Sequence, residues 1–359
     1  MKVGIVGMPN AGKSSLFNAL TRAGAEAANY PFTTIEPNVA IVPVADDRLE
    51  QVAALLKASN VVHDTIAFHD IAGLVRGASE GEGLGNKFLA NIRETDALVH
   101  VVRAHGDDNV IHPEGRVDPR ADIDTIETEL IYADLEQAER RLERVVKAAR
   151  GGDKVAVAEG EWLRALIAAL QEGRPARTVP PPADVPHALR DLSPLTAKPV
   201  LFVANVDEGD DTVPAEVVEH AAAHGAQAVA VSSRIEAELS ELDDEEAAVM
   251  REELGIAESG LQRIVRGAFS LLDLIAFFTV GEAKPAQSWH LRRGLTAWHA
   301  AGQIHSDIQR GFVRAEVIAW DALMDAGGYG VARERGTLRV EGRDYAMHDG
   351  DVLTVKFTP

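Results

Sequence analysis

Nine residues near the N-terminus have the types and spacing of a phosphate-binding loop. The segment GMPNAGKSS, residues 7–15, follows the apolar run 3–6 and precedes residues 16–20, which have a helical pattern. This is the motif G-x-x-x-x-G-K-[ST] between a strand and a helix. Its glycines allow a tight turn whose N–H groups point at an anion, and the helix adds the positive end of its dipole. The segment therefore predicts a site for the phosphates of a nucleotide.

The polar positions of this loop have distinct expected roles. Lys13 is expected to reach the β- and γ-phosphates and so to take part in catalysis, and the Ser14 hydroxyl is expected to bind Mg²⁺. The other loop residues predicted to contact the nucleotide are Asn10, Ala11, Gly12 and Ser15.

The loop at residues 29–38 could close over a bound triphosphate. It contains two prolines with polar residues between them, which marks it as irregular. We expect Thr34 to bind the γ-phosphate and Mg²⁺, and Phe32 to contact the nucleotide. The alternative for Thr34 is an ordinary turn residue.

A D-x-x-G segment follows a short predicted strand. Asp70 would hold Mg²⁺ through a water molecule, and Gly73 would offer its N–H to the γ-phosphate during catalysis. Some GTPases place a glutamine next in the chain to orient the attacking water, but here the residue is Leu74. Five glycines between Gly73 and Gly85 predict a switch that senses the nucleotide, and Leu74 predicts slow hydrolysis.

The segment NVDE, residues 205–208, bears on the choice of base. Many GTPases have N-K-x-D here, with the aspartate accepting from guanine and the lysine covering the ring. Val206 replaces that lysine, and Glu208 replaces the aspartate with a side chain one methylene longer. Adenine has no donors at the corresponding positions, so the change predicts a preference for ATP over GTP. We expect Asn205 to bond the adenine edge, with Ser232 and Ser233 also contacting the nucleotide.

Composition limits the other functions of the chain. It has 359 residues, 56 acidic and 36 basic, and a net charge of −20, which opposes non-specific binding to nucleic acid. It has no cysteine, so disulfides and thiolate metal sites are excluded. No apolar run is long enough to cross a bilayer. We expect a cytoplasmic monomer that binds neither DNA nor membranes.

The order of the patterns predicts an α/β protein with two additions. Alternating strands and helices over 1–104 and 198–275 predict a phosphate-loop NTPase domain of the G-domain type with a mainly parallel sheet. Residues 105–197 interrupt it with a coiled-coil seam and a returning helix, which predict an inserted antiparallel hairpin. Six basic residues near its tip could contact RNA or protein, although a solvated helix face is the commoner meaning. Residues 276–359 change to short strands and predict a separate α+β domain.

These segments together resemble the Obg-like ATPase, or YchF, family along nearly the whole chain. The segments that show the resemblance are GMPNAGKSS, NYPFTTIEPN from Asn29, DIAGLVRGASEGEGLGNKFL from Asp70, NVDE, VSSRIEAEL from Val231, and the C-terminal FFTVGE, GFVRAEVI and DGDVLTVKF. The resemblance implies that residues 276–359 form a TGS domain with the ubiquitin-like β-grasp fold. It also implies slow, Mg²⁺-dependent hydrolysis of ATP, with GTP poorer, and association with ribosomes or ribosomal RNA.

Two site residues rest on this resemblance. It implies that His112 positions the attacking water, against the equally weighted alternative of a surface histidine. It also implies that Asn10 holds K⁺, whereas a purely local role in the loop is the alternative. A GTP-preferring translation or ribosome-assembly GTPase remains the competing function.

Overall fold

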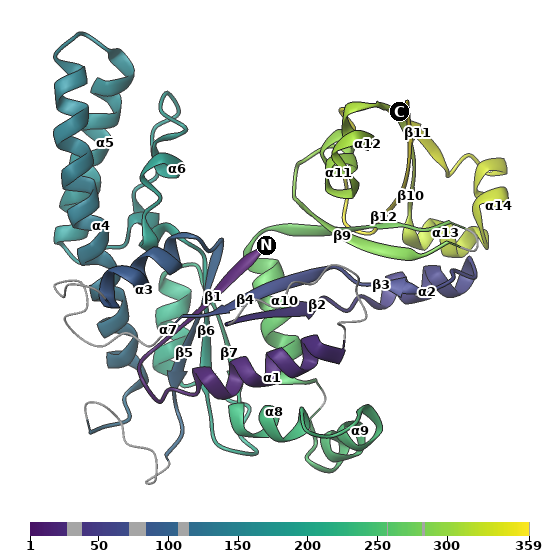
Figure 1. Ribbon diagram of the computed structural model, residues 1–359, viewed down its shortest axis with the longest axis horizontal. Helices are drawn as coiled ribbons and strands as arrows, with labels where there is room; N and C mark the ends of the chain where they lie inside the picture. Colours follow the sequence, from purple (N-terminus) through teal and green to yellow (C-terminus); the bar gives the residue numbers. More distant parts are fainter. Residues whose placement is uncertain (27–37, 72–83, 107–114, 257, 282–283, 359) are drawn as a thin grey trace. The chain divides into compact units, whose positions relative to one another are not determined.

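The computed structural model describes residues 1–26, 38–71, 84–106, 115–256, 258–281 and 284–358. Contacts along the chain group it into two compact units. One contains Met1–Val42 and Ala67–Leu271, and the other contains Pro43–Ile66 and Leu272–Pro359. Each unit has its own six-stranded sheet, traced by colour in Figure 1.

The sheet of the first unit has the order β2-β4-β1-β5-β6-β7. Its strands are β1 Lys2–Val6, β2 Val39–Pro43, β4 Thr65–Asp70, β5 Ala97–Arg103, β6 Val200–Asn205 and β7 Gln227–Val231. The five strands from β4 to β7 are parallel. All residues of β5 and β6 are buried, as expected when helices cover both faces of a parallel sheet. The predicted α/β class is confirmed.

Helices pack on both faces of this sheet, and others of the unit lie away from it. The helices of the unit are α1 Lys13–Glu26, α3 Leu84–Arg93, α4 Pro119–Ala149, α5 Lys154–Gln171, α6 Ala188–Leu192, α7 Ala215–Ala223, α8 Ser233–Leu239, α9 Asp244–Glu253 and α10 Gly260–Leu271, with 3₁₀ turns at Ala176–Thr178 and Leu195–Ala197. One apolar cluster joins α3, α4 and α7 to Leu98 and Phe202. On the other face α10 approaches β6 closely, because a Cβ on Gly267 would lie 2.9 Å from the Leu201 side chain.

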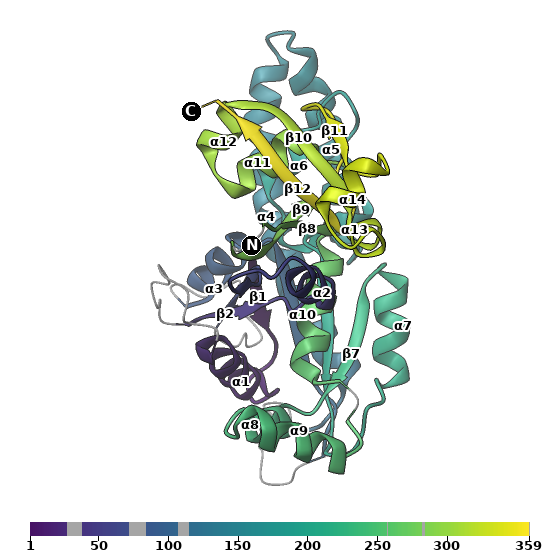
Figure 2. The same ribbon diagram turned by 90° about the vertical axis from the view of Figure 1, so that its right-hand side faces the viewer.

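The inserted hairpin has the predicted helices. Helices α4 and α5 lie side by side, and the views in Figures 1 and 2 agree on this. Ile131, Ala138 and Val145 of α4 are buried against Leu163 and Leu166 of α5. The four-and-three spacing in the sequence therefore marks the seam correctly.

A buried carboxylate fixes the end of the insertion to α4. Asp134 is 1% exposed and accepts the backbone N–H of Leu195 at 2.7 Å and that of Thr196 at 2.8 Å. The Thr196 hydroxyl also donates to it, at 2.7 Å. These hydrogen bonds hold the turn at 195–197 against α4, just before the chain enters β6.

The second unit has the sheet order β11-β10-β12-β8-β9-β3. Its strands are β3 Val61–Val62, β8 Leu274–Thr279, β9 Ala286–Arg292, β10 Phe312–Ala319, β11 Arg339–Glu341 and β12 Asp351–Phe357. Its helices are α2 Asp47–Leu55, α11 Ala297–Ile304, α12 Ser306–Arg310, α13 Trp320–Ala326 and α14 Tyr329–Glu334. The β8–β9 hairpin is antiparallel, β12 pairs in parallel with β8, and α11 packs on this mixed sheet, whose predicted β-grasp identity stays a prediction.

The structure differs from the predicted domain limits in one segment. Residues 43–66, predicted as part of the nucleotide-binding domain, pack with the C-terminal unit. Strand β3 pairs with β9, and Arg48 of α2 donates to Asp349 at 2.7 Å. Asp349 in turn accepts the N–H of Ala276 at 2.8 Å. Strand β9 itself was not predicted from the sequence.

Candidate nucleotide site

The predicted phosphate loop lies where the order of the parallel strands reverses. The chain places β4 on one side of β1 and then β5 on the other. Ligands of open parallel sheets bind at the carboxyl ends of the strands, at such a switch point. Residues 7–12 follow β1 directly, and α1 begins at Lys13. The loop, its strand and its helix are therefore placed as predicted.

Two glycines of the loop are required by close packing. Gly7 has φ of 154° and Gly12 has φ of 101°, which side chains rarely adopt. A Cβ on Gly7 would lie 2.3 Å from the Val101 carbonyl oxygen, and one on Gly12 would lie 2.3 Å from the Asn205 amide nitrogen. The loop is thus pressed against the ends of β5 and β6.

Lys13 is buried beside a carboxylate. It is 7% exposed, and its ammonium group donates to the Met8 carbonyl oxygen at 2.8 Å. Burial lowers the pKa of Lys13 to about 8, and the charge of Asp70 opposes this effect. Burial likewise raises the pKa of Asp70, against the effect of Lys13. The two groups predicted to act on the phosphates and Mg²⁺ therefore influence each other within one site.

Asn205 connects the loop to the next strand–helix junction. Its amide nitrogen donates to the Ala11 carbonyl oxygen at 3.1 Å, and its amide oxygen accepts the Ser233 N–H at 2.9 Å. It is 3% exposed. In this structure both ends of the amide serve as a brace between backbone segments, so the predicted contact with the adenine edge remains a prediction.

The two substitutions in NVDE occupy different surroundings. Val206 is 3% exposed and packs with Ala204 and Ala230 in an apolar cluster. The Val206 side chain therefore faces the core, and its predicted contact with the nucleotide stays a prediction. Glu208 is exposed and pairs with Arg234 at 2.9 Å.

A cavity of about 490 Å³ opens beside the loop. The loop and strand-end residues that line it are Asn10, Gly12, Lys13, Ser14, Ser15, Asn205 and Ser233. Ser14 and Ser15 are exposed there, as ligands of Mg²⁺ and phosphate must be. Ser232 instead caps α8 by accepting the Ile235 N–H.

Part of the cavity lining was not predicted from the sequence. The further residues are His105, Arg234, Ala237, Glu238 and Glu241. Four of them belong to α8 or follow it directly, and an amphipathic pattern does not reveal that one face of this helix borders a cavity. The segment VSSRIEAEL contains three of these residues, so its two serines were a sequence signal for this part of the lining.

Several predicted site residues lie outside the described part of the chain. They are Phe32, Thr34, Gly73, Leu74 and His112. Their predicted roles stay as predictions. Among the described residues, the structure brings together the phosphate loop with Lys13, Asp70 and Asn205.

Full-length relatives identify the family. A protein of Bacillus subtilis (strain 168) named "Ribosome-binding ATPase YchF" is 48% identical over 363 residues, covering 99% of both chains. The chain belongs to the YchF family. A relative of the same name from Mycoplasma genitalium is 43% identical over 99% of each chain.

Family models and solved structures agree with membership in the YchF family. A model described as "50S ribosome-binding GTPase" matches residues 2–143, and the YchF GTPase C-terminal model, described as a protein of unknown function, matches residues 274–358. The structure of the Schizosaccharomyces pombe YchF GTPase has a TM-score of 0.88 and 34% identity, covering 99% of this chain and 97% of that one. A GTP-binding protein from Pyrococcus horikoshii OT3, at 21% identity and a TM-score of 0.63, shares the fold.

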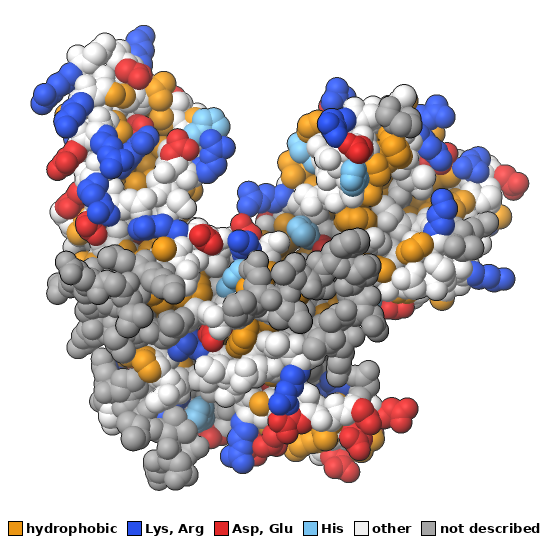
Figure 3. Space-filling model, viewed as in Figure 1, with side chains coloured by type: hydrophobic (Ala, Val, Ile, Leu, Met, Phe, Trp, Pro, Cys, Tyr) orange, Lys and Arg blue, Asp and Glu red, His pale blue; other side chains and the backbone are white. Residues whose placement is uncertain are grey.

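The YchF hairpin presents a basic surface. Lys and Arg side chains gather over α4 and α5 in Figure 3. Arg140 and Arg141 are paired with Glu136 and Glu159. The exposed basic residues nearest the tip are Arg144, Lys147, Arg150 and Lys154. No helix in the described part of the chain is long and apolar enough to cross a membrane.

Proposed function

We propose that this YchF family member binds ATP, hydrolyses it slowly with Mg²⁺, and binds ribosomes in a manner set by the nucleotide. The observation that carries the proposal is the braced phosphate loop. Lys13, Asp70 and Asn205 meet around it beside a cavity large enough for a nucleotide. We include ribosome binding because full-length relatives are named ribosome-binding ATPases.

The proposed metal site uses oxygen ligands around the loop. Ser14 and Thr34 would bind Mg²⁺ directly, and Asp70 would hold it through water, as in other phosphate-loop proteins. Mg²⁺ prefers oxygen ligands and keeps several waters, which suits an exposed hydroxyl beside a carboxylate. The ion would neutralise charge on the phosphates while Lys13 and the Gly73 N–H stabilise the γ-phosphate.

We propose slow turnover because Leu74 can neither donate to nor accept from a water molecule. His112 is our candidate for positioning that water, and Asn10 for holding K⁺. The loop geometry favours a special role for Asn10, which has φ of 62° and lines the cavity. We also propose that the chain is a cytoplasmic monomer and that residues 276–359, together with 43–66, form its TGS domain.

A GTP-preferring enzyme is the second candidate. The Schizosaccharomyces pombe relative is titled a GTPase, and Glu208 offers a carboxylate near the guanine-reading position of GTPases. Against this, Glu208 is paired with Arg234, and Val206 leaves no cation to cover the base. The Glu208–Arg234 pair is exposed at the surface, so its own contribution to stability is small.

Nucleotide titration of a Glu208→Asp variant tests the base preference. We expect the unaltered chain to bind Mg-ATP more tightly than Mg-GTP. The shorter carboxylate should improve GTP binding by about tenfold, roughly 1.4 kcal/mol, because it restores the acceptor geometry of N-K-x-D. Calorimetry with both nucleotides measures this, with Glu241→Asp, another shortened carboxylate and one that lines the cavity, as control. Tighter binding of GTP than ATP by the unaltered chain, tenfold or more, would rule out the proposed preference.

A further inference from the structure

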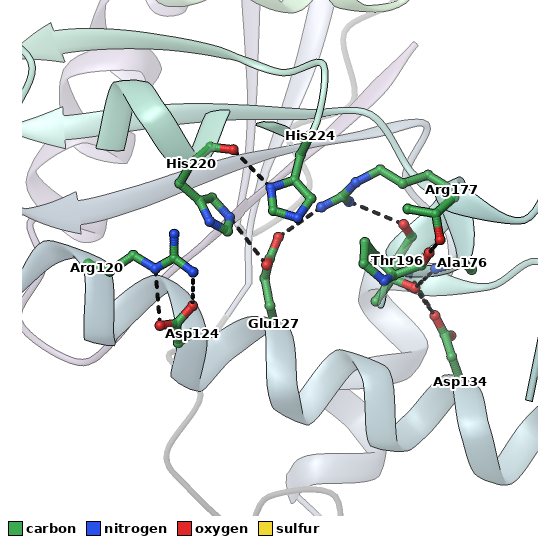
Figure 4. A network of polar contacts seen from close by, with 11 residues as sticks. Arg120, Asp124, Glu127, Asp134, Ala176, Arg177, Thr196, His220 and His224 are labelled. Carbon is green, nitrogen blue, oxygen red and sulfur yellow. Dashed lines mark hydrogen bonds and ion pairs between the residues drawn. The ribbon is translucent and has the colours of Figure 1, made fainter. Parts of the chain in front are cut away.

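A second cluster of ligand-bearing side chains lies away from the nucleotide cavity. Glu127 of α4 meets His220 and His224 at the C-terminal end of α7 (Figure 4). One ligand atom from each of the three side chains lies within 4.8 Å of the other two. None of the three lines the nucleotide cavity. The cluster connects the lower part of the hairpin to a helix on the sheet.

The local sequence HAAAH brings the two imidazoles together. Residues four apart lie on the same side of a helix, and two histidines at this spacing are a known arrangement for binding Zn²⁺. The rings of His220 and His224 are 4.2 Å apart between centroids. The Nδ1 atom of His224 lies 2.8 Å from the His220 carbonyl oxygen, the acceptor it would donate to. This hydrogen bond fixes the tautomer in which Nε2 of His224 carries a free lone pair.

His220 is buried next to the Glu127 carboxylate. It is 2% exposed, and the edge-on ring contact with Phe202 has centroids 5.3 Å apart. Nε2 of His220 lies 3.2 Å from a Glu127 oxygen. Among the described residues, however, neither of its ring nitrogens has a partner in hydrogen-bond geometry. Buried polar atoms without partners are rare in folded proteins, and a bound ion is one explanation.

The carboxylate of Glu127 is divided between two neighbours. Arg177 donates to one oxygen at 2.9 Å and also to the Thr196 carbonyl oxygen at 3.2 Å. The other oxygen faces His220. Glu127 therefore turns one oxygen toward the imidazoles while Arg177 holds the other.

We propose that Glu127, His220 and His224 form a binding site for a divalent transition metal, with Zn²⁺ the best match. Two imidazoles and one carboxylate are a common zinc ligand set, in which a water molecule completes the tetrahedron. With bonds of about 2.0–2.1 Å, ligand atoms of tetrahedral zinc are about 3.3 Å apart, which matches the His220–Glu127 separation. Mg²⁺ is a poor match because it favours oxygen ligands. The ion would link α4 to α7.

Metal binding can be measured directly on the full chain. Equilibrium dialysis against Zn²⁺ with excess Mg²⁺, which occupies the oxygen-rich nucleotide site, should give one tightly bound Zn²⁺ per chain. Co²⁺ in its place should show the visible absorption of a tetrahedral ion. His224→Ala should weaken binding by at least about tenfold, because one ligand is lost. His187→Ala is the matched control, since His187 is an exposed histidine of the same unit.

A second readout separates metal binding from damage to the fold. Zn²⁺ should raise the thermal midpoint of the unaltered chain and of His187→Ala, because a ligand of the native state stabilises it. It should not raise that of His224→Ala or of Glu127→Gln, whose amide oxygen still accepts from Arg177. The absence of bound Zn²⁺, or equal binding and equal thermal shifts in all four chains, would overturn the proposal. The cluster would then be only a hydrogen-bonded brace.

Discussion

Single residues of the phosphate loop are held by contacts that cross the sheet. Asn205 joins the Ala11 carbonyl oxygen to the Ser233 N–H, and Gly12 leaves room for it. The loop motif was readable from the sequence because its conformation depends on two glycines within one short segment. The orientation of Asn205 and Val206 was not readable, because it depends on Ala11, Ala230 of β7 and Ser233, which are distant in the chain.

Removing the Asn205 amide should loosen the loop. Asn205→Ala leaves a buried carbonyl oxygen and a buried N–H without their partner, at a cost of about 1–3 kcal/mol each. We expect affinity for Mg-ATP to fall by about tenfold or more. Nucleotide titration of the variant measures this, with Asp243→Ala as a control that removes the N-cap of α9 and does not line the cavity. Unchanged affinity in Asn205→Ala would show that the brace does not shape the site.

Lys13 should make nucleotide binding depend on pH. Its lowered pKa, about 8, means that Lys13 is mostly neutral at pH 9 and mostly charged at pH 7. Phosphates beside Lys13 favour its charged form and raise its pKa. Nucleotide binding should therefore be accompanied by uptake of close to one proton at pH 9 and of only a small fraction of a proton at pH 7. Affinity should accordingly fall as pH rises above about 8. Calorimetry of Mg-ATP binding in buffers of different ionisation enthalpy measures the uptake, and equal uptake at both pH values would contradict the expected role.

The elements of the chain were predicted best where their patterns are local. The heptad spacing of α4 located the hairpin, and alternating strands and helices located the first sheet. The segment 43–66 was assigned to the wrong unit because its partner strand, β9, is more than two hundred residues away along the chain. A two-residue strand such as β3 gives no pattern from which that pairing could be inferred.

Asp134 should be the most sensitive polar position of the hairpin. Asp134→Ala removes the acceptor of three hydrogen bonds at the turn 195–197 and leaves buried donors unpaired. We expect the free energy of unfolding to fall by about 2–4 kcal/mol. Urea denaturation followed by circular dichroism measures it.

The matched control is Asp124→Ala on the same helix. Asp124 is exposed and, among the residues that the structure describes, pairs only with Arg120 in the neighbouring turn, so its loss should change stability by about 0.5 kcal/mol or less. If the two variants were equally stable, the buried carboxylate would not anchor the insertion as described.

The molecule as a whole combines a nucleotide site with surfaces suited to a large partner. The net charge of −20 opposes general binding to RNA, whereas the exposed basic residues of the hairpin offer a local positive surface (Figure 3). Hydrolysis slowed by Leu74 would let the bound triphosphate persist while the partner is engaged. We therefore expect nucleotide occupancy to control ribosome binding.

Co-sedimentation with ribosomes tests this claim most directly. The purified chain is pelleted with ribosomes in the presence of a non-hydrolysable ATP analogue, ADP, the corresponding GTP analogue or no nucleotide, with Lys13→Ala as the matched control. We expect the largest bound fraction with the ATP analogue, a smaller one with ADP and the GTP analogue, and no dependence on nucleotide in Lys13→Ala. Equal bound fractions of the unaltered chain under all four conditions would contradict the account.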